Sequence, residues 1–390
     1  MLSRGRRVGN ATSAGRHYLL LVHPERVSTF ELFFDLVFVF TITQLTGALH
    51  ADSSATGVLR VLLMLAVIWW MYGGYAWLTN AVSAEQGRYR LALLVGMMGF
   101  LAISLAIPTA FTTGGVVFGL GYLLVVLVHV ALFARAGAGA VRGMRAVAPR
   151  NVAAALVLTL AGALASRTTA PVGLMLWGAA VLVLWLPQRA STERGFEIGP
   201  AHFVERHGLV VIIALGESVI AVATGTSVHP LGPASLGIAA LGLLLSVALW
   251  WVYFDRDDSA AVRALERAPA AERPLKVKVG YGYWHYGLLL GIIATAAGMK
   301  DAVGAPFHHL HVPASIALSG GVAFYLASHA GFRRTLLDER WSPRLLWGAL
   351  AALATVPIGL HGTAVIQLAA LVLVLVLSVT ARRGSSTSRA

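Results

Sequence analysis

The chain has 390 residues, of which 57% are hydrophobic and 12% are charged, and its mean hydropathy is +0.75. This composition excludes an ordinary soluble domain and predicts an integral membrane protein. The formal net charge is +13, but no basic stripe interleaves with aromatic residues on a soluble module, so we predict no nucleic-acid partner. The absence of cysteine excludes disulfides, thiolate nucleophiles and Cys-based metal sites.

Twelve apolar runs follow one another along the chain, and most are long enough to cross a bilayer as a helix. They are continuous in Leu, Val, Ala and Gly instead of alternating with polar residues, which favours helices over a β-barrel. The predicted fold class is therefore an all-α integral membrane protein with about twelve transmembrane helices. The runs lie at 29–49, 58–79, 91–111, 116–134, 151–166, 171–187, 207–226, 233–254, 280–299, 312–332, 345–361 and 363–381.

The basic residues predict the orientation of these helices. If the N-terminus is cytoplasmic, every Lys and Arg lies on a cytoplasmic segment except Arg60, Arg167 and Lys300, as the positive-inside rule requires. The first 28 residues have no apolar stretch that ends in a cleavage site, so we expect a cytoplasmic tail and not a signal peptide. We predict a multi-pass protein of the bacterial inner membrane with both termini cytoplasmic and a disordered tail at 382–390.

Two aromatic strings indicate an internal repeat. WWMY begins at Trp69 and WWVY at Trp250, and an acid precedes each string by a similar distance, Asp35 by 34 residues and Glu217 by 33. Six spans separate the members of each pair, so the two halves would insert with the same orientation, as parallel repeats do. The predicted division is a membrane half at 29–187, a cytoplasmic linker at 188–206 and a second membrane half at 207–381.

The acids within apolar runs are the first candidates for function, because a carboxylate in hydrocarbon is costly unless it faces a partner or water. Glu31 and Asp35 stand four residues apart, so they share one helical face, and Gln44 lies near that direction. Glu217 lies about midway along its run, beside Ser218. In the structural alternative, Glu31 pairs with an Arg and Glu217 is a protonated side chain that bonds across a helix interface.

Three of these strings also resemble a known family. STFELFFDLVFVFTITQL, HFVERHGLVVIIALGESVIAV from His202 to Val222 and WWVYFD at 250–255 are similar to the bacterial low temperature requirement A proteins, and the similarity covers nearly the whole chain after residue 23. The resemblance implies a membrane fold and localisation and supplies no reaction. The family's motif positions would here be Glu31, Phe34, Asp35, Glu205, Arg206, Gly216, Glu217 and Ser218.

Further polar residues have a functional and a structural interpretation. His285 lies among aromatic residues and would serve either in a proton relay or as an interhelical hydrogen-bonding residue. Glu205 and Arg206 are expected as a solvated or helix-capping pair at the cytoplasmic mouth. The DxDD string that starts at Asp255 is expected to be a solvated, salt-bridged helix terminus. HHLH at 308–311 lacks a carboxylate or thiol partner nearby in sequence, so we predict no metal site.

Three functional classes stay open: a transporter in which intramembrane carboxylates bind a proton, cation or small solute, an intramembrane enzyme that acts on a lipid or isoprenoid, and a non-catalytic sensor or assembly component. We favour the first and expect no cofactor. The expected partners are the lipid bilayer and a proton or small cation, and a homo-oligomer stays open. The predicted binding residues are Glu31, Asp35, Gln44, Trp69, Trp70, Glu217, Ser218, Trp250, Trp251 and His285, with Glu205, Arg206 and Asp255 at the mouth.

Overall fold

Every regular element of the described residues is a helix, which confirms the all-α class. The computed structural model describes residues 26–81, 87–135, 138–165, 167, 169–186, 198–227, 230, 232–255 and 257–386. Residues 1–25 of the N-terminal tail predicted at 1–28, and most of the predicted linker, lie outside these residues.

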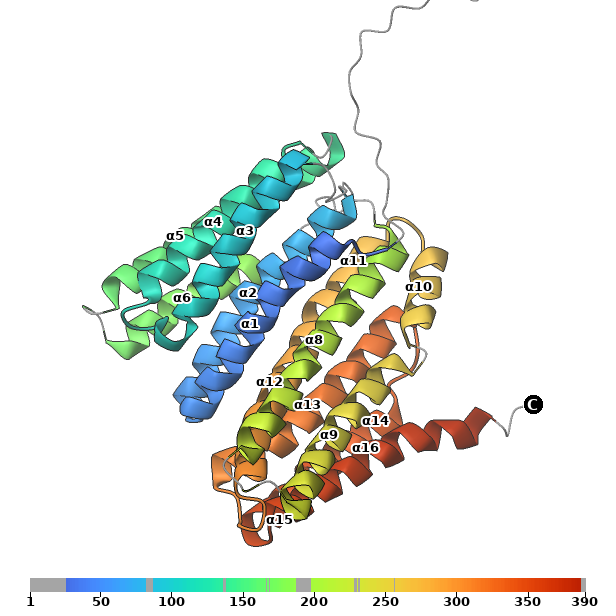
Figure 1. Ribbon diagram of the computed structural model, residues 1–390. Coiled ribbons are helices and arrows are strands. Elements are labelled where there is room, and N and C mark those ends of the chain that lie inside the picture. Colours follow the sequence, from blue (N-terminus) through green and yellow to red (C-terminus); the bar gives the residue numbers. More distant parts are fainter. Residues whose placement is uncertain are drawn as a thin grey trace, which may run out of the picture.

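The first helix group, α1–α6, forms one side of the molecule (Figure 1). Within it α1 packs against α2 and α3, each helix from α3 to α5 packs against the next, and α2 packs against α6. Its elements are α1 (Thr29–Ala51), α2 (Ala55–Ala81), α3 (Gly87–Ala106), the short 3-10 helix η1 (Ile107–Thr109), α4 (Gly115–Phe133), α5 (Ala138–Leu164) and α6 (Ala170–Trp185).

The second helix group, α8–α16, lies beside the first and follows the same order of neighbours (Figure 1). Here α8 packs against α9 and α12, α12 against α13, α13 against α14, α14 against α16, and α9 against α16. Contacts between the groups come mainly from α1 and α2, which face α8, α12 and η2. Its elements are α8 (Pro200–Thr226), α9 (Pro233–Phe254), α10 (Asp257–Arg267), α11 (Arg273–Val277), the π-helix η2 (Lys278–Trp284), α12 (His285–Gly304), α13 (Val312–Leu336), α14 (Pro343–Leu353), α15 (Val356–His361) and α16 (Ala364–Ser386).

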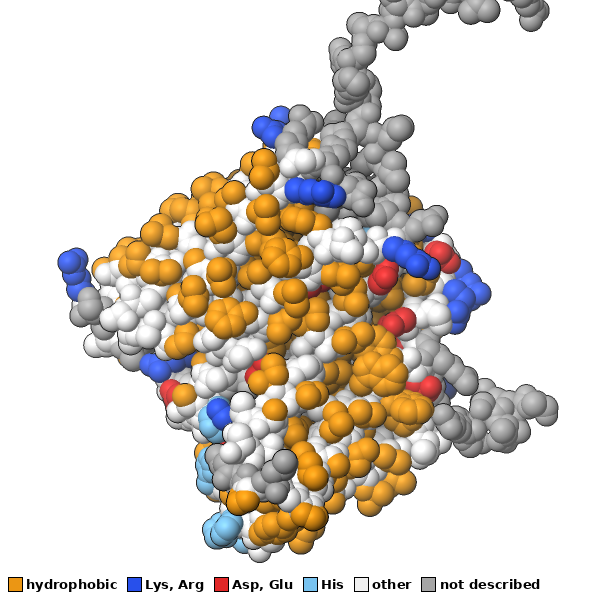
Figure 2. All heavy atoms as spheres, in the orientation of Figure 1, with side chains coloured by type: hydrophobic (Ala, Val, Ile, Leu, Met, Phe, Trp, Pro, Cys, Tyr) orange, Lys and Arg blue, Asp and Glu red, His pale blue; other side chains and the backbone are white. Residues whose placement is uncertain are grey.

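Nine of the described helical segments are long and apolar enough to cross a membrane. The apolar parts of α6 and α16 are shorter, and α13 is not among the nine, so the count of twelve remains a prediction. Figure 2 shows hydrophobic side chains over most of one face, with charged side chains mostly near its margins. Such a surface suits lipid and not water.

Two helix ends differ from the predicted boundaries. Helix α8 begins at Pro200, inside the segment 188–206 that was expected to be a linker. Proline there is helix-compatible because the first turn needs no intrahelical N–H bond. At the other end α16 continues to Ser386, beyond the expected end of the span at 381, so part of the tail predicted to be disordered is helical.

The second group is held together at its centre by close backbone contact between α12 and α13. A Cβ at Gly298 would lie 2.5 Å from the backbone nitrogen of Leu318, and one at Gly321 would lie 2.5 Å from that of Thr295. Small residues permit this approach, which is the usual way for helices to pack tightly in a membrane.

Candidate functional site

A buried arginine joins the two helix groups. Arg206 of α8 is 1% exposed, and its Nη1 donates to Glu31 Oε1 of α1 over 2.7 Å and also to the hydroxyl of Thr79. Its Nη2 donates to Asp35 Oδ1 over 3.3 Å, while the hydroxyl of Tyr72 donates to the same oxygen over 2.9 Å. We call these five residues and His202 the Arg206 cluster.

His202, one helical turn before the arginine, extends the cluster towards the start of α8. Its Nε2 lies 3.1 Å from Glu31 Oε1. Glu31 also accepts from Ser28 in a capping box that starts α1. The Asn80 side chain fixes the start of α8 by donating to the Gly199 carbonyl and accepting from its N–H, over 3.0 and 2.9 Å. The ends of α1, α2 and α8 are therefore tied by one polar network.

The cluster leaves one carboxylate oxygen without a partner. Asp35 is fully buried, and its Oδ2 has no hydrogen-bond partner among the described residues. Both acids share the guanidinium of Arg206, and Glu31 has His202 as a further partner. Asp35, which has the unpartnered oxygen, is thus the acid of the cluster on which a proton would be best accommodated.

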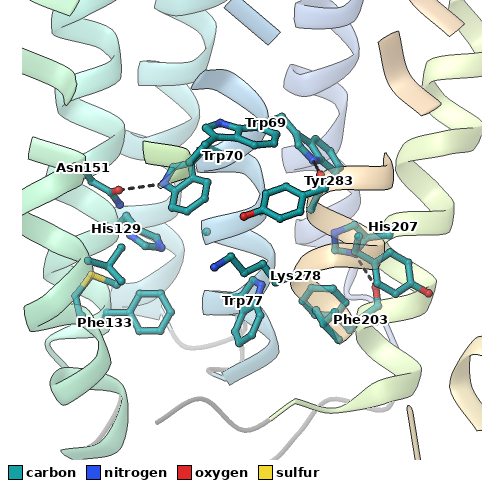
Figure 3. A pocket seen from close by; sticks show the side chains of 18 residues that line it. Trp69, Trp70, Trp77, His129, Phe133, Asn151, Phe203, His207, Lys278 and Tyr283 are labelled. Atoms are coloured by element: carbon teal, nitrogen blue, oxygen red, sulfur yellow. Dashed lines mark hydrogen bonds between the residues drawn. The ribbon is translucent and has the colours of Figure 1, made fainter. Parts of the chain in front are cut away.

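An aromatic cavity of about 140 Å³ lies next to this cluster, between the helix groups (Figure 3). Tyr72 of the cluster stacks on Trp69 of the cavity wall, with ring centroids 5.2 Å apart and planes 9° from parallel. The two features therefore share the inward face of α2. The lining residues are Trp69, Trp70, Gly73, Gly74, Trp77, His129, Phe133, Met144, Val147, Asn151, Trp185, Phe203, His207, Val277, Lys278, Tyr281, Gly282 and Tyr283.

The π-helix η2 contributes four of these residues from the second group. A π-helical turn is rare and widens the backbone spiral, and such turns occur frequently at functional sites. Here it directs Lys278, Tyr281 and Tyr283 to the cavity, and the Gly282 carbonyl accepts from the Trp69 indole over 2.7 Å. This hydrogen bond connects the π-helix of one group directly to α2 of the other.

Three polar side chains give the cavity its chemical character. Lys278 is the one described lining residue with a full charge, and no carboxylate lines the described wall. The Asn151 carbonyl oxygen accepts from the Trp70 indole over 3.0 Å, which orients the amide and leaves its NH₂ group as a donor. His129 is 3% exposed, and neither of its ring nitrogens has a hydrogen-bond partner among the described residues.

The position of His129 depends on the glycine opposite it. A Cβ on Gly74 would lie 2.9 Å from His129 Nε2, so only a residue without a side chain leaves room for the ring. A buried imidazole without a hydrogen-bond partner costs about 1–3 kcal/mol. This cost is recovered when a ligand atom or water supplies the partner.

The predicted binding residues fall into separate places. Glu31, Asp35 and Arg206 meet in the cluster, and Trp69 and Trp70 line the cavity. Glu217 accepts from Thr43 over 2.6 Å, and Thr43 lies eight residues after Asp35, or about 12 Å along α1. Ser218 is buried beside Glu217, and Gln44 is half-buried.

Other predictions for the second group need correction. Trp250 and Trp251 of α9 are each 42% exposed and line no part of the described cavity. Helix α9 packs mainly against α8 and α16 of its own group. Arg206 is buried and not solvated, whereas Glu205 beside it is exposed and accepts from the Val27 N–H over 3.1 Å. Asp255, the first residue of the DxDD string, is half-buried at the end of α9.

The same string holds an acid that is buried instead of solvated. Asp257 pairs with His329 Nε2 over 3.0 Å and with Arg333, which also binds Glu339. His285, the remaining predicted residue, accepts from or donates to Tyr253 over 2.8 Å and is thus an interhelical hydrogen-bonding residue.

Several site residues escaped the sequence analysis. Lys278 is one of the basic residues that predict the orientation, and Asn151 and Tyr283 carry no sequence signal of their own. His202 and Arg206 do carry a sequence signal, because their i, i+4 spacing matches that of Glu31 and Asp35 on the facing helix.

Comparison with known proteins assigns the chain to a family. The sequence profile described as bacterial low temperature requirement A protein matches residues 26–380. An uncharacterized protein of Rhizobium meliloti strain 1021 is 28% identical over 332 residues, which cover 81% of this chain and 78% of that protein. No solved structure gives a significant match.

Proposed function

The chain belongs to the bacterial low temperature requirement A family, and we propose that it is a membrane carrier whose solute site is the aromatic cavity between its two helix groups. The location of the cavity is the observation that carries this proposal. Helices α2, α4, α5 and α6 line it from one side, and α8, α11 and η2 line it from the other. A site between two halves is what alternating access requires.

The similar packing of the two groups supports a carrier built from parallel repeats. In the first group α1 packs against α2 and α3, and the series of contacts continues from α3 to α6. In the second group α8 packs against α9 and α12, and the series continues from α12 to α16. Few helices connect the groups, so one group can rotate against the other with limited repacking. We take α1–α6 and α8–α16 as the two halves and twelve as the number of spans.

The cavity belongs to the cytoplasmic side in this proposal. Each lining helix contributes residues near the end that adjoins one of the basic connecting segments. If the positive-inside rule holds, these segments are cytoplasmic, and the protein lies in the inner membrane with both termini in the cytoplasm.

Asp35 is the proposed proton site that couples to rotation of the halves. Protonation would remove its attraction for Arg206 and so weaken a tie between α1 and α8. Glu217 stays a second candidate at a different depth. The enzyme alternative is less well supported, because the carboxylates that it would use as acid and base do not line the described cavity wall.

A cysteine-accessibility experiment tests alternating access, and the natural chain is a suitable background because it has no cysteine. The probe is Gly73→Cys, since Gly73 lines the cavity and a Cβ there meets nothing within 4 Å. A membrane-impermeant maleimide is applied to right-side-out and to inverted vesicles. We expect labelling from both sides, with the ratio of the two rates changed by Asp35→Asn.

The matched control is Gly178→Cys on α6, whose Cβ also meets nothing within 4 Å but which does not line the cavity. The control should react from neither side. Labelling of Gly73→Cys from one side only would mean a fixed pocket and would refute the carrier.

A further inference from the structure

A second polar contact joins the two helix groups, far from the Arg206 cluster. His50 lies in the last turn of α1, and Asp301 lies in the last turn of α12. Their side chains meet with 3.4 Å between His50 Nδ1 and Asp301 Oδ2, and each side chain is 28% exposed. Helix α1 belongs to the first group and α12 to the second, so this contact also connects the proposed halves. We call it the His50–Asp301 tie.

The tie lies at the opposite end of the contact between the groups. Helices α1 and α8 both begin at the Arg206 cluster. Helices α8 and α12 end together, because a Cβ on Gly225 of α8 would lie 2.9 Å from the carbonyl oxygen of Lys300 in α12. The three helices therefore run side by side in the same direction (Figure 1). In the proposed orientation the cluster is cytoplasmic, so the tie lies at the outer face.

The contact depends on charge more than on a hydrogen bond. His50 Nδ1 is shielded from solvent and has no hydrogen-bond partner among the described residues, although Asp301 is close to it. A negative charge in the last turn of a helix is unfavourable, whereas a positive charge there is stabilising. A protonated His50 therefore suits the end of α1 and compensates Asp301 at the end of α12, and a neutral imidazole does neither.

Other charged groups at this end do not replace the two partners. Asp52, the nearest acid along α1, is paired with Arg60 over 3.4 Å. Lys300 precedes Asp301, but successive helical residues point about 100° apart. Residues 218–227 of α8 carry no charge. The exposed imidazoles nearby in sequence, His308, His309 and His311, lie in the segment between α12 and α13.

We infer that the His50–Asp301 tie is a proton-binding site that closes the outer end of the carrier. The ion pair forms when His50 binds a proton and is lost when the imidazole is neutral, a change that imidazoles undergo near physiological pH. This inference rests on the proposed function, because it assigns the tie to the movement of the two halves. A proton then has opposite effects at the two ends: it strengthens the outer tie through His50 and weakens the inner one through Asp35.

Spin-label distances across the outer end test the inference on the full chain in nanodiscs. Thr56→Cys at the start of α2 and Phe307→Cys after α12 are both exposed and place one label on each group. We expect the ratio of the shorter to the longer distance to be about two- to fivefold higher at pH 5 than at pH 8, because partly exposed ion pairs contribute modestly. The control pair of Leu236→Cys with Phe307→Cys, within the second group, should not change.

Substitutions in the tie separate it from other titrating groups. His50→Gln and Asp301→Asn should each abolish the pH dependence, and exchanging the two residues by combining His50→Asp with Asp301→His should restore it. His50→Arg should keep the shorter distance at both pH values. If His50 only stabilised the end of α1, the pH effect would persist in Asp301→Asn.

A pH effect that persists in His50→Gln or Asp301→Asn would overturn the inference. So would the absence of any pH effect when His50 and Asp301 are both present. The two-sided labelling of Gly73→Cys does not involve the tie, so the carrier can stand when the outer proton site fails.

Discussion

Removal of the buried arginine tests whether the Arg206 cluster is an ion-pair network. Arg206→Met keeps most of the side-chain volume but leaves Glu31 and Asp35 buried without the cation that binds both. Breaking a buried pair by removing one partner costs about 3–5 kcal/mol. At about 1.4 kcal/mol for each factor of ten, this is a change of two to three and a half orders of magnitude in the folding equilibrium.

The charge effect can be separated from the packing effect by removing the acids as well. The triple variant Arg206→Met, Glu31→Gln and Asp35→Asn has a similar shape and no buried charge at these positions, and neutral replacements of whole buried networks are often tolerated. We expect it to recover most of the lost stability in an SDS titration of unfolding in mixed micelles. A triple variant as unstable as Arg206→Met, or a single variant as stable as the natural chain, would refute this reasoning.

Three other substitutions test the remaining structure by thermal unfolding in detergent. Gly321→Ala should lower the melting temperature, because its Cβ would lie 2.5 Å from the backbone of α12. The control Gly320→Ala should not, because the nearest atom to its Cβ is 3.9 Å away. Equal effects of the two substitutions would contradict the close packing of α12 and α13. Thr43→Val removes the hydrogen bond to Glu217 and should cost about 1–3 kcal/mol, and Thr43→Ser should restore it if the bond matters. Asp257→Asn should cost about 3 kcal/mol, since it breaks a buried pair with an arginine; an unchanged melting temperature would show that the pair is not stabilising.

The sequence predicts much of the Arg206 cluster. Glu31 and Asp35 share one helical face, and the structure buries that face. The partner was also readable, because His202 and Arg206 have the same i, i+4 spacing at the start of a later apolar run. A stripe of two acids in one span and a stripe of two bases in another satisfy each other, and that complementarity outweighs the expectation of a solvated pair for Arg206.

The cavity could be predicted only in part. Trp69 and Trp250 begin matching strings, yet one lines the cavity and the other is substantially exposed. The difference arises because α2 faces the second group while α9 packs against α8 and α16. The sequence period gives the face of a helix but does not tell which neighbour covers it.

The place of Lys278 depends on a backbone feature that no propensity predicts. It starts the π-helix η2, and the wider turn changes the direction of each side chain that follows. Read as a regular helix or a loop, the same residue is one of several basic charges near the membrane surface. Here the local backbone and not the residue type decides the role.

Distance measurements between spin labels on the two helix groups test the carrier most directly. Cysteines at Arg135 and Arg263, both exposed, place one label on each group, and Arg90 with Arg135 gives a control pair within the first. A carrier predicts two distance populations for the first pair, with a ratio that Asp35→Asn changes, and one unchanged population for the control. A single distribution between the groups, identical in both proteins, would contradict the proposal that the two groups move against each other.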